Sequence, residues 1–146
     1  MRLTRYTDYA MRTLLYVAAR PDRLSSIAEI ADVYAISKNH LMKVVNDLVT
    51  AGYLDGIRGR NGGIRLARSA SQINVGEVIR HTEEGFDLAD CKTCIIAPVC
   101  GFTGVLGKAL AAFMAVLDSY SLQDLVIDQG ELSKLFNLAQ GESAFS

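Results

Sequence analysis

The chain of 146 residues has no tryptophan, only two prolines and a net charge of −1, whereas half of its residues are hydrophobic. So little proline among so many apolar residues excludes a long disordered or low-complexity chain. No apolar run occurs in the first eight residues, so we expect no secretory signal. The longest apolar stretch, 109–117, lies between Lys108 and Asp118 and is far shorter than the roughly 20 residues that a bilayer requires. We therefore expect a soluble cytoplasmic protein with no membrane partner, in which cysteines stay reduced.

The charged residues are unevenly distributed along the chain. Residues 1–68 contain eleven Lys or Arg and six Asp or Glu, a net charge of +5. Residues 69–146 contain four bases and ten acids, a net charge of −6. A basic half followed by an acidic half favours a DNA-binding domain at 1–68 and a regulatory or dimerising part at 69–146.

The basic half predicts a helix-turn-helix. Apolar residues recur at helical spacing over 7–19, and a capping box at Ser26 and Glu29 begins a short second helix. Ser37 caps a third helix that buries one apolar face and leaves polar and basic residues exposed at its start. This is typical of a helix that enters the major groove. We expect phosphate or groove-entry contacts from Ser37 and Lys38, and base contacts from Asn39, Met42 and Lys43.

A glycine-rich stretch at 53–66 has two short alternating runs and predicts a β-hairpin, the wing of a winged helix. Arginines around the tip suit contacts with phosphates or the minor groove. A nucleotide-binding loop is the alternative, but no Gly-Lys-Ser/Thr and no helix follows. The expected wing contacts are Arg58, Arg60, Asn61 and Arg65.

The acidic half predicts a helix from Val75 to about Glu84, with Gly85 as its C-cap, and a long apolar helix after Cys100. The long helix repeats apolar residues in heptad-like steps, beside glycines and alanines that permit close approach. Packing inside a monomer would give the same pattern, but a long helix beyond a small winged domain favours a homodimer. The fold class is thus mainly α with a small β-hairpin, a winged helix-turn-helix plus a long dimerisation helix.

All three cysteines, Cys91, Cys94 and Cys100, lie within ten residues. Thiolates so close together repel one another unless a metal neutralises them, and an odd number cannot all form internal disulfides. Pro98 predicts a loop before Cys100, and Cys100 itself lies at a helix start, which lowers a thiol pKa. A metal or iron–sulfur site is favoured. Buried structural cysteines and a Cys91/Cys94 redox pair are the alternatives.

Several short motifs occur along the chain. They are Met1-Arg2-Leu3-Thr4 with Thr7-Asp8-Tyr9-Ala10, Ile36-Ser37-Lys38-Asn39-His40-Leu41, Gly52-Tyr53, Arg58-Gly59 with Asn61-Gly62-Gly63-Ile64-Arg65-Leu66, Val75-Gly76-Glu77-Val78, and Pro98 with Cys100. Together they resemble the Rrf2 family of winged-helix iron–sulfur regulators, over nearly the whole chain. The first-helix and wing motifs are the most specific, and the cysteine spacing is less so. The resemblance is strongest to the repressors of that family that sense nitric oxide.

The resemblance implies an iron–sulfur cluster of the 4Fe–4S type, held by Cys91, Cys94 and Cys100 of one subunit and Asp8 of the other. It also implies a homodimer that binds a palindromic operator and responds to nitric oxide. The gap between Cys91 and Cys94 is shorter than is usual in the family, which leaves a 2Fe–2S cluster as the alternative. Thr103 stands where regulators of cluster supply carry a histidine.

Three other functions remain. A regulator of cluster supply or iron status is the second candidate, and a zinc or thiol-redox winged-helix regulator is the third. A thiol-disulfide enzyme using Cys91 and Cys94 ranks last, because such enzymes place the pair at a helix start in a strand-rich fold, and no strand-helix alternation occurs here. We therefore expect a regulator and not an enzyme.

Overall fold

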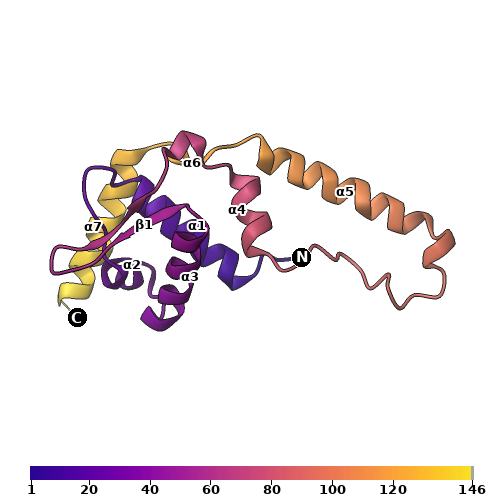
Figure 1. The fold of residues 1–146 in the computed structure, drawn as a ribbon, viewed down its shortest axis with the longest axis horizontal. Coiled ribbons are helices and arrows are strands. Elements are labelled where there is room, and N and C mark those ends of the chain that lie inside the picture. Colours follow the sequence, from indigo (N-terminus) through magenta and orange to yellow (C-terminus); the bar gives the residue numbers. More distant parts are fainter. Residues whose placement is uncertain (146) are drawn as a thin grey trace.

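The computed structural model describes residues 1–145, and its main elements are helices and one small sheet (Figure 1). This confirms the predicted fold class. Short 3-10 turns lie at 70–72 and 97–99. In chain order the helices and strands are α1 (Arg5–Ala18), α2 (Ile27–Tyr34), α3 (Lys38–Thr50), β1 (Leu54–Ile57), β2 (Gly63–Leu66), α4 (Val75–Thr82), α5 (Gly101–Asp118), α6 (Leu122–Leu125) and α7 (Gln129–Phe145).

Side chains that were expected to cap helices do so. Ser26 and Glu29 form the full capping box of α2, and the Ser37 hydroxyl accepts a hydrogen bond from the His40 amide at the start of α3. Between these helices Ala35 adopts a left-handed conformation with φ of 54°, which allows the tight turn. The helix-turn-helix therefore follows from local signals.

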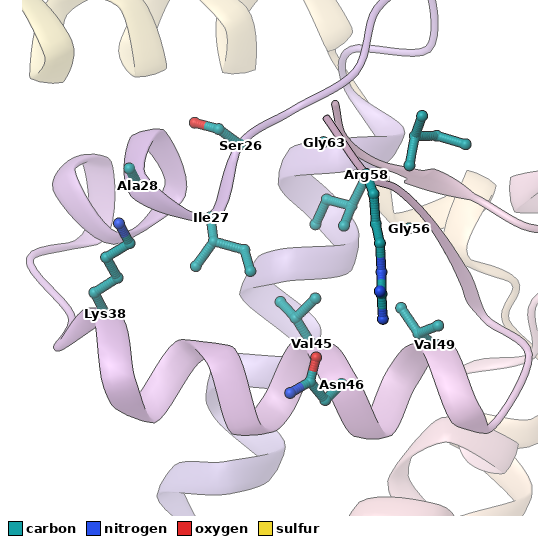
Figure 2. A pocket seen from close by; sticks show the side chains of 12 residues that line it. Ser26, Ile27, Ala28, Lys38, Val45, Asn46, Val49, Gly56, Arg58 and Gly63 are labelled. Carbon is teal, nitrogen blue, oxygen red and sulfur yellow. The ribbon is translucent and has the colours of Figure 1, made fainter. Parts of the chain in front are cut away.

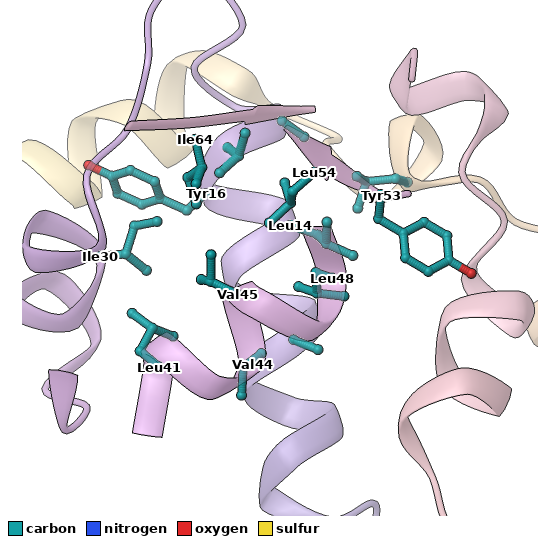
Figure 3. Packing of buried hydrophobic residues seen from close by; sticks show 14 of the residues in the cluster. Leu14, Tyr16, Ile30, Leu41, Val44, Val45, Leu48, Tyr53, Leu54 and Ile64 are labelled. Atoms are coloured by element: carbon teal, nitrogen blue, oxygen red, sulfur yellow. The ribbon is translucent and has the colours of Figure 1, made fainter. Parts of the chain in front are cut away.

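The core lies between α1, α2 and α3, with the hairpin closing one side (Figure 3). Leu14 and Tyr16 from α1, Ile30 from α2 and Leu41 from α3 are all 0% exposed. Burying each of these side chains contributes about 1.5–3 kcal/mol of transfer free energy. The apolar face of α3 is thus fixed to the core, which leaves its opposite face to solvent.

The hairpin pairs β1 with β2 in antiparallel register, Leu54 opposite Leu66 and Ile57 opposite Gly63. The chain between α1 and α2 also pairs with it, since the Ser25 amide donates to the Ile64 carbonyl at 3.0 Å and the Ile64 amide donates to Ser25 at 2.8 Å. These bonds hold the predicted wing against the helix-turn-helix.

Helix α4 ends earlier than predicted. Its last residue is Thr82 and its C-cap is Glu83 in an extended conformation, so Gly85 is not the cap. The Glu83 carboxylate accepts hydrogen bonds from Thr4 and Thr7 at the start of α1. A tertiary contact therefore ends this helix, which local sequence signals do not reveal.

After α5 the chain returns to the N-terminal lobe, which consists of α1, α2, α3 and the β1–β2 hairpin. Helix α6 packs near α1 and α7 packs along α2, so the last helix covers the first helix of the helix-turn-helix (Figure 1). Phe136 of α7 packs against Tyr16 with ring centroids 4.7 Å apart and the rings tilted by 41°, and Gln140 donates to the Tyr16 hydroxyl at 3.2 Å. The part of the chain after residue 118 thus contributes to the core of the N-terminal lobe.

Helix α5 corrects the expectation drawn from the apolar stretch at 109–117. Its 18 residues have a mean hydropathy of 1.4, enough by length and composition to cross a membrane. The apolar run is longer than it first appeared because the glycine-rich residues before Lys108 join the same helix. Length and composition alone are weak support for a membrane span. An apolar helix that is exposed in one chain and covered by a second copy in a dimer would have the same length and composition.

Glu29 provides a pH-dependent contribution to the stability of this lobe. Burial alone would raise the pKa of Glu29, but hydrogen bonds from Arg23, the Ser26 amide and the Tyr16 hydroxyl lower it to about 2. A lowered folded-state pKa stabilises the fold above the ordinary value of 4.5, and this contribution is lost as the pH falls from there toward about 2. Glu29→Gln should therefore lower the free energy of unfolding by about 1–3 kcal/mol at neutral pH.

Urea unfolding between about pH 7 and pH 3 measures this effect, and the difference from wild type should shrink below about pH 4.5. Glu77→Gln is the matched control, because the Glu77 side chain is 55% exposed and 4.0 Å from Arg68. It should change stability by less than about 0.5 kcal/mol. A loss for Glu29→Gln that stays constant over the whole pH range would contradict this account.

Candidate functional site

All nine side chains predicted to contact DNA are exposed. Leu41, Val44, Val45 and Leu48 take the inner face of α3, so the residues between them point to solvent. Met42 is 41% exposed although it is apolar, which suits contact with a base edge. The exposed residues are Ser37, Lys38, Asn39, Met42 and Lys43 on α3 and its cap, and Arg58, Arg60, Asn61 and Arg65 on the wing.

A groove of about 560 Å³ runs between the start of α2, the outer side of α3 and the wing (Figure 2). Val45, Val49 and Ile57 form part of an apolar floor. Lys38 and Arg58 supply positive charge from α3 and from the wing, and Arg58 extends across the groove toward α3. Two cations from separate elements beside one groove form a surface suited to a phosphate backbone.

The tip of the wing is a tight turn, in which the Gly62 amide donates to the Gly59 carbonyl at 3.0 Å. Gly59 has φ of 109°, which side chains rarely adopt, so glycine is needed there. The turn leaves Arg60 and Asn61 exposed. Arg65 lies 3.9 Å from Asp55, its cross-strand partner, so part of its charge is already compensated.

The cysteines lie on the loop before α5 and at its N-cap, and all three are free thiols. Cys100 is the N-cap residue of α5, and the nearby backbone amides of Thr103 and Phe102 lower the pKa of its thiol. The Thr103 hydroxyl also donates to the Cys91 sulfur at 3.5 Å. Thr103 therefore draws Cys91 and Cys100 to the same helix end, while Cys94 is exposed on the loop.

Asp8 lies in the first turn of α1, in a pocket of about 750 Å³. Its carboxylate accepts a hydrogen bond from Arg12 Nε at 3.0 Å, and both side chains are close to half exposed. Arg2 and Arg5 line the same pocket, so a carboxylate is surrounded by positive charge there. Anionic thiolates or a negatively charged cluster would meet a favourable potential at this position.

Within one chain Asp8 and the cysteines do not meet. The cysteine loop lies at the far end of α5, away from α1 (Figure 1). No group of three His, Cys, Asp or Glu side chains that could hold a metal ion occurs in residues 1–145. The donor chemistry nevertheless suits iron–sulfur binding, since soft thiolates at a helix N-terminus stabilise an anionic cluster. The predicted four-ligand site would require residues from two chains.

Sequence patterns missed two residues that contact the start of α1, Arg12 and Glu83. Arg12 follows Asp8 by one helical turn, and that spacing could have predicted the ion pair. Glu83 accepts hydrogen bonds from the Thr4 amide at 3.1 Å and the Thr4 hydroxyl at 2.7 Å, which fixes the start of α1. Burial alone would raise the pKa of Glu83, but the bonds from Thr7 and Thr4 lower it. No local pattern predicts this contact between residues so far apart in sequence.

Comparison with known proteins identifies relatives over nearly the whole chain. The model of the Rrf2 family, described as an iron-dependent transcriptional regulator, matches residues 3–128. A protein of Bacillus licheniformis named HTH-type transcriptional regulator NsrR is 50% identical over 143 residues, which cover 94% of this chain and 100% of that protein. A protein of the same name from Bacillus subtilis strain 168 is 49% identical over 146 residues, 96% of this chain and 100% of the relative.

A solved structure supports the same assignment of the fold. The structure of T. potens IscR superposes with a TM-score of 0.73 at 26% identity and covers 90% of both chains. The chain thus has a helix-turn-helix, a wing and free thiols before a long helix. Its sequence is also similar to transcriptional regulators over nearly its full length. The chain belongs to the Rrf2 family of transcriptional regulators.

Proposed function

We propose that this protein is a homodimeric repressor that binds a palindromic operator and loses it when nitric oxide attacks a bound iron–sulfur cluster. The observation that carries the proposal is that three free thiols lie on the loop before α5 and at its N-cap, beside a helix of which only 6% is buried and away from α3 and the wing (Figure 1). The relatives named NsrR, about half identical over their full length, support the assignment. In this proposal residues 1–68 bind DNA, and residues 69–146 hold the cluster and form the dimer.

The uncovered surface of α5 supports the dimer. Met114 is the one buried residue of this helix among the described residues, and Phe102, Val105 and Val116 are each about 60% exposed. This exposure argues against packing inside a monomer, the alternative drawn from the same apolar repeat. A second copy of α5 would cover these side chains and remove apolar surface from water.

The cluster would be held by Cys91, Cys94 and Cys100 of one subunit and by Asp8 of the other. When bound, it would supply iron that reacts with nitric oxide. Thr103 would orient Cys91 and Cys100, and the amides at the start of α5 would stabilise their negative charge. A carboxylate is a harder and weaker donor than a thiolate, so Asp8 would be the most easily displaced ligand.

Release of Asp8 would affect DNA binding through α1. Asp8 belongs to the lobe that contacts DNA, whereas the cysteines belong to the loop before α5. In a dimer the two α3 helices must lie about 34 Å apart, or a multiple of that distance, to enter successive major grooves. A coupling of about 1–3 kcal/mol between the cluster and the lobe positions would change operator affinity by about 5- to 150-fold.

The proposal is tested by comparing the iron-loaded protein with the same protein stripped by a chelator. Anaerobically purified protein should be brown, should contain iron and inorganic sulfide, and should bind its selected DNA duplex more tightly than the stripped protein. Colourless protein containing zinc would favour the zinc regulator. A response to iron supply without a response to nitric oxide would favour an iron-status regulator, in line with the family's description as iron-dependent.

Asp8→Ala should preserve the dimer and weaken cluster retention, because the variant keeps all three thiols and loses only the carboxylate. We expect faster loss of visible absorbance under a chelator and an altered response to nitric oxide. Asp22→Ala is the control, since Asp22 is an exposed acid in the turn after α1. If Asp8→Ala retains the spectrum and the response of wild type, Asp8 is not part of the site.

Lys43→Ala and Arg60→Ala should weaken DNA binding in different ways. Lys43 on α3 is assigned to a base edge, so its loss should relax the preference at one base step by about 1–3 kcal/mol. Arg60 at the wing tip is assigned to the DNA phosphate backbone, so its loss should lower affinity for all sequences. The salt dependence of binding should then show about one counterion fewer released. Fluorescence anisotropy with matched and mismatched duplexes at several salt concentrations measures both. Identical behaviour of the two variants would contradict the assignment.

A further inference from the structure

Within the described residues, helix α5 packs against the body of the protein near its C-terminus, and a long loop connects its other end to α4 (Figure 1). It projects from the body and joins it near its C-terminus, beside α4 (Figure 1). Only 6% of its residues are buried within the described chain. The direction of α5 relative to the DNA-binding lobe is therefore set at this joint.

The joint is built around Asp118, the last residue of α5. Arg80 of α4 donates two parallel hydrogen bonds to its carboxylate, at 2.5 Å to Oδ1 and 2.7 Å to Oδ2. Asn74, the N-cap of α4, donates from Nδ2 to the Asp118 carbonyl at 2.7 Å. A fork of two bonds fixes orientation as well as distance, which a single contact cannot do.

Gly76 lets the two helices approach at this point. A Cβ at position 76 would lie 1.9 Å from Asp118 Oδ1 and 3.1 Å from the Asp118 Cα. The Asp118 side chain could rotate away only by breaking its two hydrogen bonds with Arg80. The Asp118 Cα belongs to the backbone, so it could move only if the helix itself shifted. Only glycine permits this packing.

The other end of α4 is tied to the DNA-binding lobe. His81 Nε2 lies 3.1 Å from both carboxylate oxygens of Asp47 on α3. Glu83, directly after α4, accepts a hydrogen bond from the Thr4 hydroxyl at the start of α1. These contacts fix α4 relative to α3. The packing of Gly76 against Asp118 then fixes α5 relative to both helices.

We infer that Gly76, Arg80 and Asp118 determine which half-site spacing a dimer of this chain accepts. This inference rests on the proposed dimer and its binding to DNA. An 18-residue helix is about 27 Å long, so a turn of about 10° at one end displaces the other by about 5 Å. Successive base pairs are about 3.4 Å apart. A small change at the joint is thus enough to move the two lobes by one base step.

The test uses iron-loaded dimer and a DNA duplex that the wild-type protein selects from a randomised pool. The same duplex with one base pair added or removed at its centre gives two further probes. Asp118→Asn and Arg80→Gln should loosen the joint, so the ratio of affinities for the selected and the altered spacings should fall by at least about fivefold, the lower end of typical coupling. Gly76→Ala should shift the preferred spacing itself.

Glu77→Gln is the control, since Glu77 is on the same helix and pairs weakly with Arg68, away from α5. It should keep the wild-type ratio. If Gly76→Ala does not fold, Asp118→Asn decides alone. Variants that fold and dimerise but lose affinity equally for all three duplexes, or keep the wild-type ratio, would overturn the inference. If the wild-type protein selects no duplex with two half-sites, the proposed function fails and the inference fails with it.

Discussion

Cys100→Ser should yield a colourless protein without iron or inorganic sulfide after anaerobic purification. Cys100 is the N-cap residue of α5, where the nearby Thr103 and Phe102 amides lower the pKa of its thiol, and Thr103 also donates to the Cys91 sulfur. Changes around a metal ligand already cost about 10- to 100-fold in affinity, so loss of the ligand itself should cost more. Iron and sulfide assays, together with the visible spectrum, measure the loss.

The dimer should survive in Cys100→Ser, because the exposed apolar side chains of α5 are unchanged. Lys92→Ala is the matched control: Lys92 is exposed on the same loop between Cys91 and Cys94, and its loss should leave the cluster in place. A Cys100→Ser protein with wild-type iron and sulfide would remove Cys100 from the site.

Leu41→Ala should lower the free energy of unfolding by about 2–5 kcal/mol, the usual cost of truncating a buried leucine. Leu41 is 0% exposed beneath the start of α3, and small domains have only about 5–15 kcal/mol of stability in total. Urea unfolding measures the loss, and operator affinity should fall with it because the start of α3 loses its support.

The neighbouring residue gives the control for that prediction. Met42 is 41% exposed, so Met42→Ala should change stability by less than about 0.5 kcal/mol while weakening DNA binding. The two variants separate the face of α3 that packs from the face that meets DNA. Equal destabilisation by both would contradict this orientation of the helix.

Much of the fold is predictable because its signals are local. Ser26 and Ser37 cap the helices that they were expected to cap, and the glycines at 59–63 form the tip of the expected hairpin. The start of α5 at Cys100 follows from Pro98 and from the apolar repeat after it. In each case the residues that decide the structure are neighbours in the sequence.

The other features depend on contacts between distant residues. Glu83 leaves α4 to bind the start of α1, so the cap expected at Gly85 does not form. Phe136 returns α7 to Tyr16, although nothing in the periodicity of α7 specifies which lobe it meets. The packing of Gly76 against Asp118 likewise depends on two helices whose mutual approach no local pattern encodes.

The candidate site was predictable in its parts and not in their arrangement. Spacing predicted the three cysteines as ligands, and the structure places Cys91 and Cys100 beside one residue, Thr103, while Cys94 stays exposed on the loop. The role of Asp8 came from the family resemblance, and one chain alone does not bring it to the cysteines. A site shared between two chains remains the prediction to test.

The most direct test is a titration of anaerobic, iron-loaded protein with nitric oxide, in which visible absorbance and retention of the selected DNA duplex are followed in the same sample. We predict that the absorbance of the cluster and the retention of DNA decline together, with a fall in affinity of at least about fivefold. Retention that stays constant while the absorbance is lost would contradict control of DNA binding by the cluster.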